Sequence, residues 1–311
     1  MQFIAPILKE LGYLDNLFFN VAVVGSRKLG GLGDIDQALI ETLAPNLAIY
    51  GFDADPDACD YANSEIQAKL ARGEMNWQEE HYPIALADTS RTTNLFVTRD
   101  LACCSLYEPN LDYARWFEVI PEAMTIDLVL PIDVFRLDDF CHEKGLTHID
   151  YLLIDVQGAD LLVLQGASSM LPDVLAIKTE VNFSNLYHHQ PLFADVDVFL
   201  RQAGFSIFDL SCNYVPRRLK AEVPVHSKRF GKFAFENESV RCGQLLWGDA
   251  IYFRDLLAVG EMCQEKLLKL SCLADLLGFT EYAYQIMEYL DLADVLQLAQ
   301  ARVQQSSTEC R

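Results

Sequence analysis

The sequence predicts an α/β protein built on a parallel sheet, and three observations support this. Short apolar runs alternate with segments of helical periodicity, which is the pattern of βαβ units. Several of these runs end in a glycine or an acid, and ligands of open parallel sheets bind at the carboxyl ends of the strands. Hydrophobic residues make up 51% of the 311-residue chain, which is enough for an extensive core.

The order of elements follows from the same pattern. The predicted strands cover residues 21–25, 47–53, 82–88, 93–99 at an edge, 151–155, 174–180, 205–210 and 250–254. The predicted helices cover residues 34–43, 57–71, 159–170 and 193–203, and the chain is helical from residue 256 to its polar tail. Asp34 is placed to cap the first helix and Pro56 to open the second, because these residue types favour those positions. Residues 100–148 are less regular, with a strand and a short helix in VLPIDVFRLDDFCHEKG.

Composition restricts the partners of the protein. The 24 basic and 45 acidic side chains give a net charge of −21, so a nucleic-acid-binding surface is not expected. No apolar run approaches the ~20 residues of a membrane span, and the N-terminus lacks the features of a signal peptide. The nine cysteines form no CxxC pair, which is typical of free thiols in a reducing compartment. We therefore expect a cytoplasmic protein that binds neither nucleic acid nor membranes.

One segment reverses the acidic character of the chain. Residues 211–235 contain a single acid, Glu222, and six basic residues: Arg217, Arg218, Lys220, Lys228, Arg229 and Lys232. The segment is either a solvated loop or a basic lid over an anionic substrate. We expect a catalytic domain over residues 1–254 with a basic insert at 211–243. Residues 255–311 form a C-terminal helical extension, which either packs on the sheet or supports a homo-oligomer.

The first two strand ends carry residues suited to a nucleotide-like cofactor. Gly25 follows the first strand and further glycines follow it, so the backbone can approach an anionic or nucleotide ligand closely. Asp36 stands where the third glycine of GxGxxG should fall, which argues against an NAD-dependent oxidoreductase. Asp53, at the end of the second strand, can accept both hydrogen bonds of a ribose diol. Asp55 is left to cap the next helix, and Asp88, ending the third strand, faces either an adenine amino group or a turn.

Six pieces of sequence in order resemble one family. They are VVGSRKLGG, YGFDADP, LFVTRDLACCSLYEPN, IDYLLIDVQGADLLVLQGA, TEVNFSNLYHHQPLFADVDVFLRQAGF and GQLLWGDAIYFRD. Together they resemble the FkbM family of S-adenosylmethionine-dependent methyltransferases over roughly residues 21–254. The resemblance implies a Rossmann-like class I fold, with a mostly parallel seven-stranded sheet and helices on both faces.

The resemblance also implies a cofactor site for S-adenosyl-L-methionine. The turn formed by Val24, Gly25, Ser26 and Arg27 is expected to hold the methionine part of the cofactor. Asp53 with Ala54 is expected to hold the ribose and Asp88 the adenine region. Ser105 lies in the SLYEPN piece, which is expected to line the cofactor cleft.

The chain departs from the family pattern at three places. Val23 stands where the family usually has an acid, and Leu153 stands where it usually has a lysine. Asp53 also replaces the usual glutamate with a shorter side chain. These differences favour an alternative reading, in which a binding or scaffold protein retains the methyltransferase fold without catalysis.

The strand ends at Asp155 and Glu180 carry the expected catalytic residues. Methyl transfer to a hydroxyl needs a base that reaches the acceptor directly or through one water. Asp155 has the best position, and His188, beside His189, has the better-matched pKa. Glu180 supports them, or joins Asp155 and Asn182 in a Mg²⁺ site. We expect an O-methyltransferase that acts on a small-molecule or glycan acceptor: a sugar, a glycan precursor or a secondary metabolite, with an anionic group where the basic segment covers it.

Overall fold

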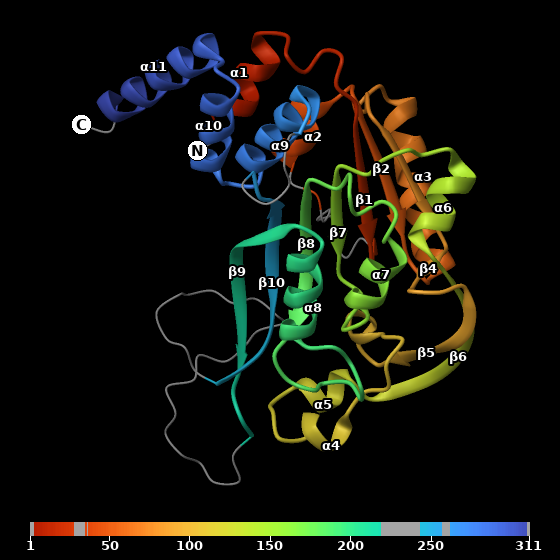
Figure 1. Cartoon of the computed structure of the whole chain (residues 1–311). Helices are drawn as coiled ribbons and strands as arrows, with labels where there is room; N and C mark the ends of the chain where they lie inside the picture. Colours follow the sequence, from red (N-terminus) through yellow and green to blue (C-terminus); the bar gives the residue numbers. More distant parts are fainter. Residues whose placement is uncertain (1–2, 28–34, 36, 219–242, 257–261, 310–311) are drawn as a thin grey trace.

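The computed structural model describes residues 3–27, 35, 37–218, 243–256 and 262–309. Its centre is a seven-stranded sheet in the order β3-β2-β1-β7-β8-β10-β9, seen near edge-on in Figure 1. The strands are β1 Phe19–Val24, β2 Leu47–Phe52, β3 Gln78–Tyr82, β7 Tyr151–Ile154, β8 Ala176–Asn182, β9 Phe205–Val215 and β10 Gln244–Arg254. All neighbours pair in parallel except β10, which is antiparallel to β8 and β9. The predicted parallel sheet is thereby confirmed.

The register of the sheet brings the strand ends together. Val23 in β1 pairs with Gly51 in β2 and with Leu153 in β7. Leu153 pairs in turn with Lys178 in β8. The carboxyl ends of these four parallel strands therefore lie at one edge of the sheet, as expected for a ligand-binding edge.

The expected third strand at residues 82–88 is wrong. The strand next to β2 is β3, and Ala85–Leu86 forms a short strand, β4, in a second sheet of order β4-β6-β5. Its partners are β5 Arg91–Thr98 and β6 Ile126–Phe135, so the predicted edge strand at 93–99 belongs to this small sheet. Because β3 lies at the edge of the main sheet, its sequence QEEHY is mostly polar and only His81 is fully buried.

Helices cover both faces of the main sheet. One face packs against α6 Leu137–Lys144, α7 Asp160–Gly166 and α8 Phe193–Gln202 through the alternate residues Ala22, Val24, Leu152 and Ile154. The other face packs against α1 Ile4–Glu10, α2 Gln37–Leu43, α9 Gln264–Leu276, α10 Thr280–Tyr289 and α11 Ala293–Glu309. The remaining helices are α3 Pro56–Ala71, which contacts β3, the 3₁₀ turn η1 Leu101–Cys103, α4 Leu111–Ala114 and α5 Ile120–Ala123.

The helices after residue 254 pack onto the sheet and onto the first helix (Figure 1). The buried Asp275 of α9 accepts hydrogen bonds from the backbone N–H groups of Phe3 (3.3 Å) and Ala5 (2.9 Å) at the start of α1. Lys269 of α9 is also buried, and its Nζ lies 3.1 Å from Oδ1 of Asp150, just before β7. Of the two sequence-based interpretations of this segment, packing on the sheet is therefore seen in the structure. No helix in the described part of the chain is both long and apolar enough to cross a membrane.

Candidate active site

The turn after β1 fits between the ends of β2 and β7. Gly25 has a φ of +86°, and its N–H, like that of Ser26, donates to the carbonyl of Phe52 at 2.9 Å. A Cβ atom at Gly25 would lie 1.9 Å from the backbone oxygen of Asp155. Glycine is thus required here both for its backbone conformation and for space. The other glycines of this turn, and Asp34, lie outside the described residues.

A buried chain of hydrogen bonds fixes this turn to β3. The Ser26 hydroxyl lies 2.9 Å from Nδ1 of His81, whose Nε2 lies 3.1 Å from a Glu79 oxygen. The indole of Trp77 donates to the other Glu79 oxygen at 3.0 Å. The Ser26 side chain therefore points into the protein, and its backbone is the part that faces the sheet edge.

The importance of His81 was missed in the sequence, although a signal was present. A Cβ atom at Gly51 would lie 2.2 Å from Nδ1 of His81, so the ring occupies the space that a side chain in the middle of β2 would take. A glycine inside an apolar strand marks such a close approach.

The two acids after β2 have different roles, and Asp55 caps the next helix as predicted. Asp55 caps α3 by accepting from the Asp57 N–H at 2.9 Å, and its other oxygen pairs with Arg27. Asp53 accepts from the N–H of Asp55 at 2.9 Å and remains half-buried at the strand end. Burial raises the pKa of Asp53, and the hydrogen bond from Asp55 and the charge of Arg27 oppose this rise. Ala54 lies between these acids and is half-buried, whereas the Val24 side chain is in the core, so only the backbone of Val24 can reach a cofactor.

Asp155 and Glu180 are brought together by a residue that the sequence did not single out. Nε2 of Gln157 lies 2.7 Å from Oδ1 of Asp155 and 3.4 Å from Oε2 of Glu180. Asn182 donates to the other Glu180 oxygen at 3.5 Å. Glu180 is 8% exposed, whereas Asp155 is open to solvent, so of the two carboxylates Asp155 is the one that a substrate can reach.

Two further acids, Asp160 and Asp249, lie close enough to Asp155 and Glu180 to affect their pKa values. Burial and repulsion from Asp155 raise the pKa values of Glu180 and of the buried Asp160 well above their usual range. The pKa of Asp155 is also raised, mainly because the surrounding protein atoms remove much of its solvation, although the side chain still reaches solvent. The negative charge of Asp249 raises it further. The charge of Lys178 and the hydrogen bond from Gln157 oppose this rise. Burial therefore favours the protonated forms of Glu180 and Asp160, and Asp155 is the acid of this group that is exposed to solvent.

Two other predicted site residues, Ser105 and His188, have different contacts near this edge. The Ser105 hydroxyl donates to the carbonyl of Gln157 at 2.7 Å and accepts from the Tyr107 N–H at 3.0 Å. Ser105 therefore supports the Asp155 turn. His188 is exposed on a loop that packs against Gly158, with its N–H bonded to the Glu108 carbonyl at 2.8 Å. The side chain of His188 makes no hydrogen bond to Asp155 or Glu180 in the described residues.

Asp88 is not at the end of a strand of the main sheet. It follows β4 of the small sheet and forms an ion pair with Arg91 at 2.5 Å. Its charge is among the factors that raise the pKa of Tyr107, after burial. An adenine contact for Asp88 stays a prediction.

The basic segment lies largely outside the described residues, which include only its start. Residues 211–215 belong to β9, and Arg217 packs over the ring of Phe117 at 5.0 Å. Arg218 donates to Glu122 at 2.8 Å. Lys220, Lys228, Arg229 and Lys232 are not described, so the lid remains a prediction.

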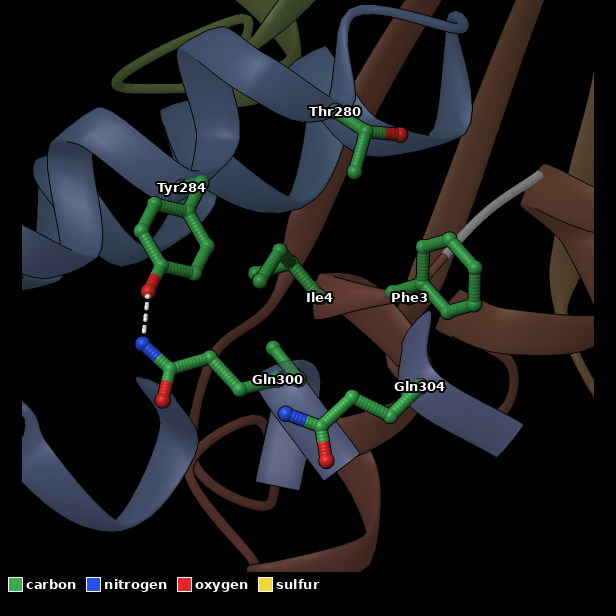
Figure 2. Close-up of a pocket in the computed structure, with 7 residues that line it drawn as sticks. Phe3, Ile4, Thr280, Tyr284, Gln300 and Gln304 are labelled. Atoms are coloured by element: carbon green, nitrogen blue, oxygen red, sulfur yellow. Dashed lines mark hydrogen bonds between the residues drawn. The ribbon is translucent and has the colours of Figure 1, made fainter. Parts of the chain in front are cut away.

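Other candidate sites were considered. No group of three or more histidines, cysteines or acids in the described ranges has the arrangement of a metal site. A cavity of about 230 Å³ lies between α1, α10 and α11 (Figure 2). It is lined by Phe3, Ile4, Thr280, Tyr284, Ala299, Gln300 and Gln304. This lining contains no acid, base or thiol, so the carboxyl edge of the sheet is the better active-site candidate.

A seven-stranded sheet with one antiparallel strand, helices on both faces and functional side chains at the carboxyl edge defines a Rossmann-like class I methyltransferase fold. The model of the methyltransferase FkbM domain matches residues 45–207, and the chain belongs to this family. Over 70 residues it is 40% identical to the 2-O-methyltransferase NoeI of Sinorhizobium fredii, a match that spans 22% of this chain and 29% of that protein.

Solved structures give weaker likenesses. The methyltransferase FkbM from Methylobacillus flagellatus is 11% identical with a TM-score of 0.39, covering 76% of this chain and 43% of that one. Magnesium protoporphyrin IX methyltransferase from Synechocystis, solved with bound SAM, is 15% identical with a TM-score of 0.34, covering 80% of this chain and 78% of that one. The fold assignment therefore rests on the strand order and on the family match.

Proposed function

We propose that this protein is an S-adenosylmethionine-dependent O-methyltransferase that acts on a hydroxyl of a sugar, glycan precursor or secondary metabolite. The observation that carries the proposal is the solvent-accessible Asp155 at the carboxyl edge, joined through Gln157 to the buried Glu180. Gly25 also lies against the backbone of Asp155, and in a chain of the FkbM family this proximity supports Asp155 as the proton acceptor.

The residues at the edge fit S-adenosylmethionine chemically. The half-buried Asp53 provides a carboxylate for a ribose diol. The surplus of acids around Asp155 suits the positive charge of a sulfonium. The bound cofactor supplies the methyl group. The protein binds and orients the acceptor and removes the proton of its hydroxyl.

Asp155 is the proposed general base. An ionised carboxylate that is open to solvent can accept the hydroxyl proton while the acceptor oxygen becomes an ether oxygen. Glu180 is the supporting acid, since it is buried and hydrogen-bonded to Gln157 and Asn182. His188 would act only through a movement of its loop, because it has no contact with either acid in the described residues.

A sugar or similar ring is favoured by the aromatic residues near the edge. Trp247 pairs with Asn182 in the β8–β10 ladder, two residues from Glu180. Tyr107 and Tyr113 pack with Trp247 on a small apolar cluster that includes α4 and α5. Flat aromatic faces offer apolar area to the C–H groups of a ring. The similarity to a 2-O-methyltransferase over part of the chain supports an oxygen as the methylated atom.

Two measurements test the proposal. Calorimetry should detect S-adenosylmethionine binding, and Asp53→Ala should weaken it about tenfold or more, as expected for hydrogen bonds to a charged group. Asp60→Ala, which removes an exposed carboxylate on the same α3 helix, is the matched control and should bind normally. Equal affinity in both variants would refute the ribose assignment. If the unaltered protein neither retains nor binds the cofactor, the scaffold alternative replaces the enzyme.

The second measurement concerns the base. Radiolabelled S-adenosylmethionine is offered with a panel of methyl glycosides that carry a free 2-hydroxyl. Asp155→Asn should lower the transfer rate by roughly 10²- to 10⁴-fold, which is the usual contribution of a general base, with cofactor binding preserved. An unchanged rate would exclude Asp155 as the base and return attention to His188.

A further inference from the structure

Gln157 has an unusual backbone conformation for its residue type. Its φ is +53°, in the left-handed region that glycine, asparagine and aspartate adopt most readily. The turn is fixed around it: the Ser105 hydroxyl donates to its carbonyl at 2.7 Å, and the next N–H, of Gly158, donates to Asp160 at 3.2 Å. Strained conformations of this kind persist where the surroundings enforce them, and they cluster at functional sites.

The strained backbone aims the side-chain amide at both carboxylates. Nε2 lies 2.7 Å from Asp155 and 3.4 Å from Glu180, so both hydrogens of the amide have an acceptor. The orientation of the amide is determined by its partners, because the opposite orientation would place its oxygen against two carboxylates. A glutamate of the same shape would add a negative charge where several acids already meet.

We propose that Gln157 is a positioning residue of the methyl transfer, whose amide clamps Asp155 to Glu180 and holds the Asp155 carboxylate as the proton acceptor for the hydroxyl. The inference rests on the proposed function. The clamp keeps one Asp155 oxygen bound, which leaves the other to the acceptor. The amide also donates a hydrogen bond to Asp155, which favours the ionised form of that carboxylate beside Glu180.

Charged and titratable groups from every neighbouring element contribute to the pH behaviour of the clamp. They are Asp160 of α7, Lys178 of β8, Asp249 of β10, Cys103 of η1 and Tyr187 of the loop before α8. In the described residues, the side-chain hydrogen bond from Gln157 and the charge of Lys178 both oppose the raised pKa of Asp155. Loss of the amide removes that hydrogen bond, while the charge of Lys178 still opposes the rise.

The test compares two substitutions with a matched control. Gln157→Gly removes the amide and relieves the backbone, and Gln157→Glu keeps the shape but adds a charge. Asp291→Gly is the control, because Asp291 has a φ of +54° between α10 and α11, far along the chain from the site. In both glycine variants the denaturation midpoint should stay at or above that of the unaltered protein.

Measurements of kcat should distinguish Gln157→Gly from Asp291→Gly. With the best methyl glycoside of the panel, Gln157→Gly should lose roughly ten- to hundredfold in kcat, as expected for a misplaced base, with cofactor affinity preserved. In both Gln157 variants the acid limb of the pH–rate profile should move to higher pH, whereas Asp291→Gly should change neither kcat nor the profile. A Gln157→Gly variant that keeps kcat and the profile would overturn the proposal and leave Gln157 a structural role.

Titration of the carboxyl groups by carbon-13 NMR gives a readout that does not depend on turnover. Removal of the amide should move the titration of Asp155 and Glu180 to higher pH. An unchanged titration overturns the clamp whatever the activity. A changed titration in a protein that transfers no methyl group contradicts the proposed function instead, and with it the catalytic part of this inference.

Discussion

Replacement of Gly25 by alanine gives the most direct test of how the cofactor turn is built. The new Cβ would lie 1.9 Å from the backbone oxygen and 2.9 Å from the backbone carbon of Asp155. Neither atom can rotate away as a side chain would, so the ends of β1 and β7 must separate.

The magnitude follows from two separate costs. A residue with a Cβ at a φ of +86° loses roughly 1–2 kcal/mol relative to glycine. Forcing extra volume into a packed interior typically costs about 1–3 kcal/mol more. The free energy of unfolding should therefore fall by about 2–5 kcal/mol, a large part of the ~5–15 kcal/mol available to a folded domain.

Gly73 provides the control for the conformational cost. It has a φ of +69° after α3, and a Cβ there would meet no atom within 4 Å. Gly73→Ala should therefore lose only the first cost, about 1–2 kcal/mol. Urea titrations of the two variants measure the difference. Equal losses in the two variants would refute the steric argument and the close contact between Gly25 and Asp155.

Three further predictions concern other parts of the fold. Gly51→Ala should lower the free energy of unfolding by about 1–3 kcal/mol, because its Cβ would clash with His81. Thermal denaturation tests this. Adding His81→Ala to the Gly51→Ala variant should recover part of the lost stability. Arg254→Met should lower the free energy of unfolding by about 2–4 kcal/mol in urea titrations, since the buried carbonyls of Leu171 and Val174 and the part-buried carbonyl of Ala203 would lose their donor. The free energy of unfolding of the Glu180→Gln variant should increase relative to that of the unaltered protein as pH rises above ~4.3. The reason is that the raised pKa of Glu180 makes the folded protein bind its proton more tightly than the unfolded chain, so stability is lost with rising pH. Urea unfolding of both proteins between pH 4 and 8 tests this. A difference in free energy of unfolding that does not change in favour of the variant with rising pH would contradict it.

The central strands could be predicted from the sequence because they are buried on both faces. β1 and β7 have no exposed residue, and apart from Asn20 their residues are apolar or aromatic. By contrast, β3 lies at the sheet edge, where polar side chains reach solvent, and its sequence QEEHY gave no strand signal. The more apolar YPIALAD was preferred for that reason, although its Ala85–Leu86 pairs with β6 in the small sheet.

The candidate site could be predicted as far as strand ends reveal it. Asp53 and Asp155 directly follow the apolar strands β2 and β7, and that position indicates the binding edge, whereas Glu180, expected at a strand end, lies inside β8, two residues before its last residue. Gln157 and His81 were missed because their roles depend on partners distant in the sequence: Glu180 is 23 residues from Gln157, and Ser26 is 55 residues from His81. Such contacts follow from the register of the sheet, which apolar patterns do not specify.

The packing of α9, α10 and α11 has a consequence for how the chain folds as it is synthesised. The sheet face that carries Val21, Val23 and Leu153 is covered by these helices, and Asp275 caps the first helix of the chain. Until residues 264–299 have emerged from the ribosome, only α1 and α2 can cover that apolar face, and the first N–H groups of α1 lack the Asp275 carboxylate. The nascent protein therefore leaves part of this face exposed through most of its synthesis, a state prone to aggregation, and we expect it to need chaperones until the last helices dock.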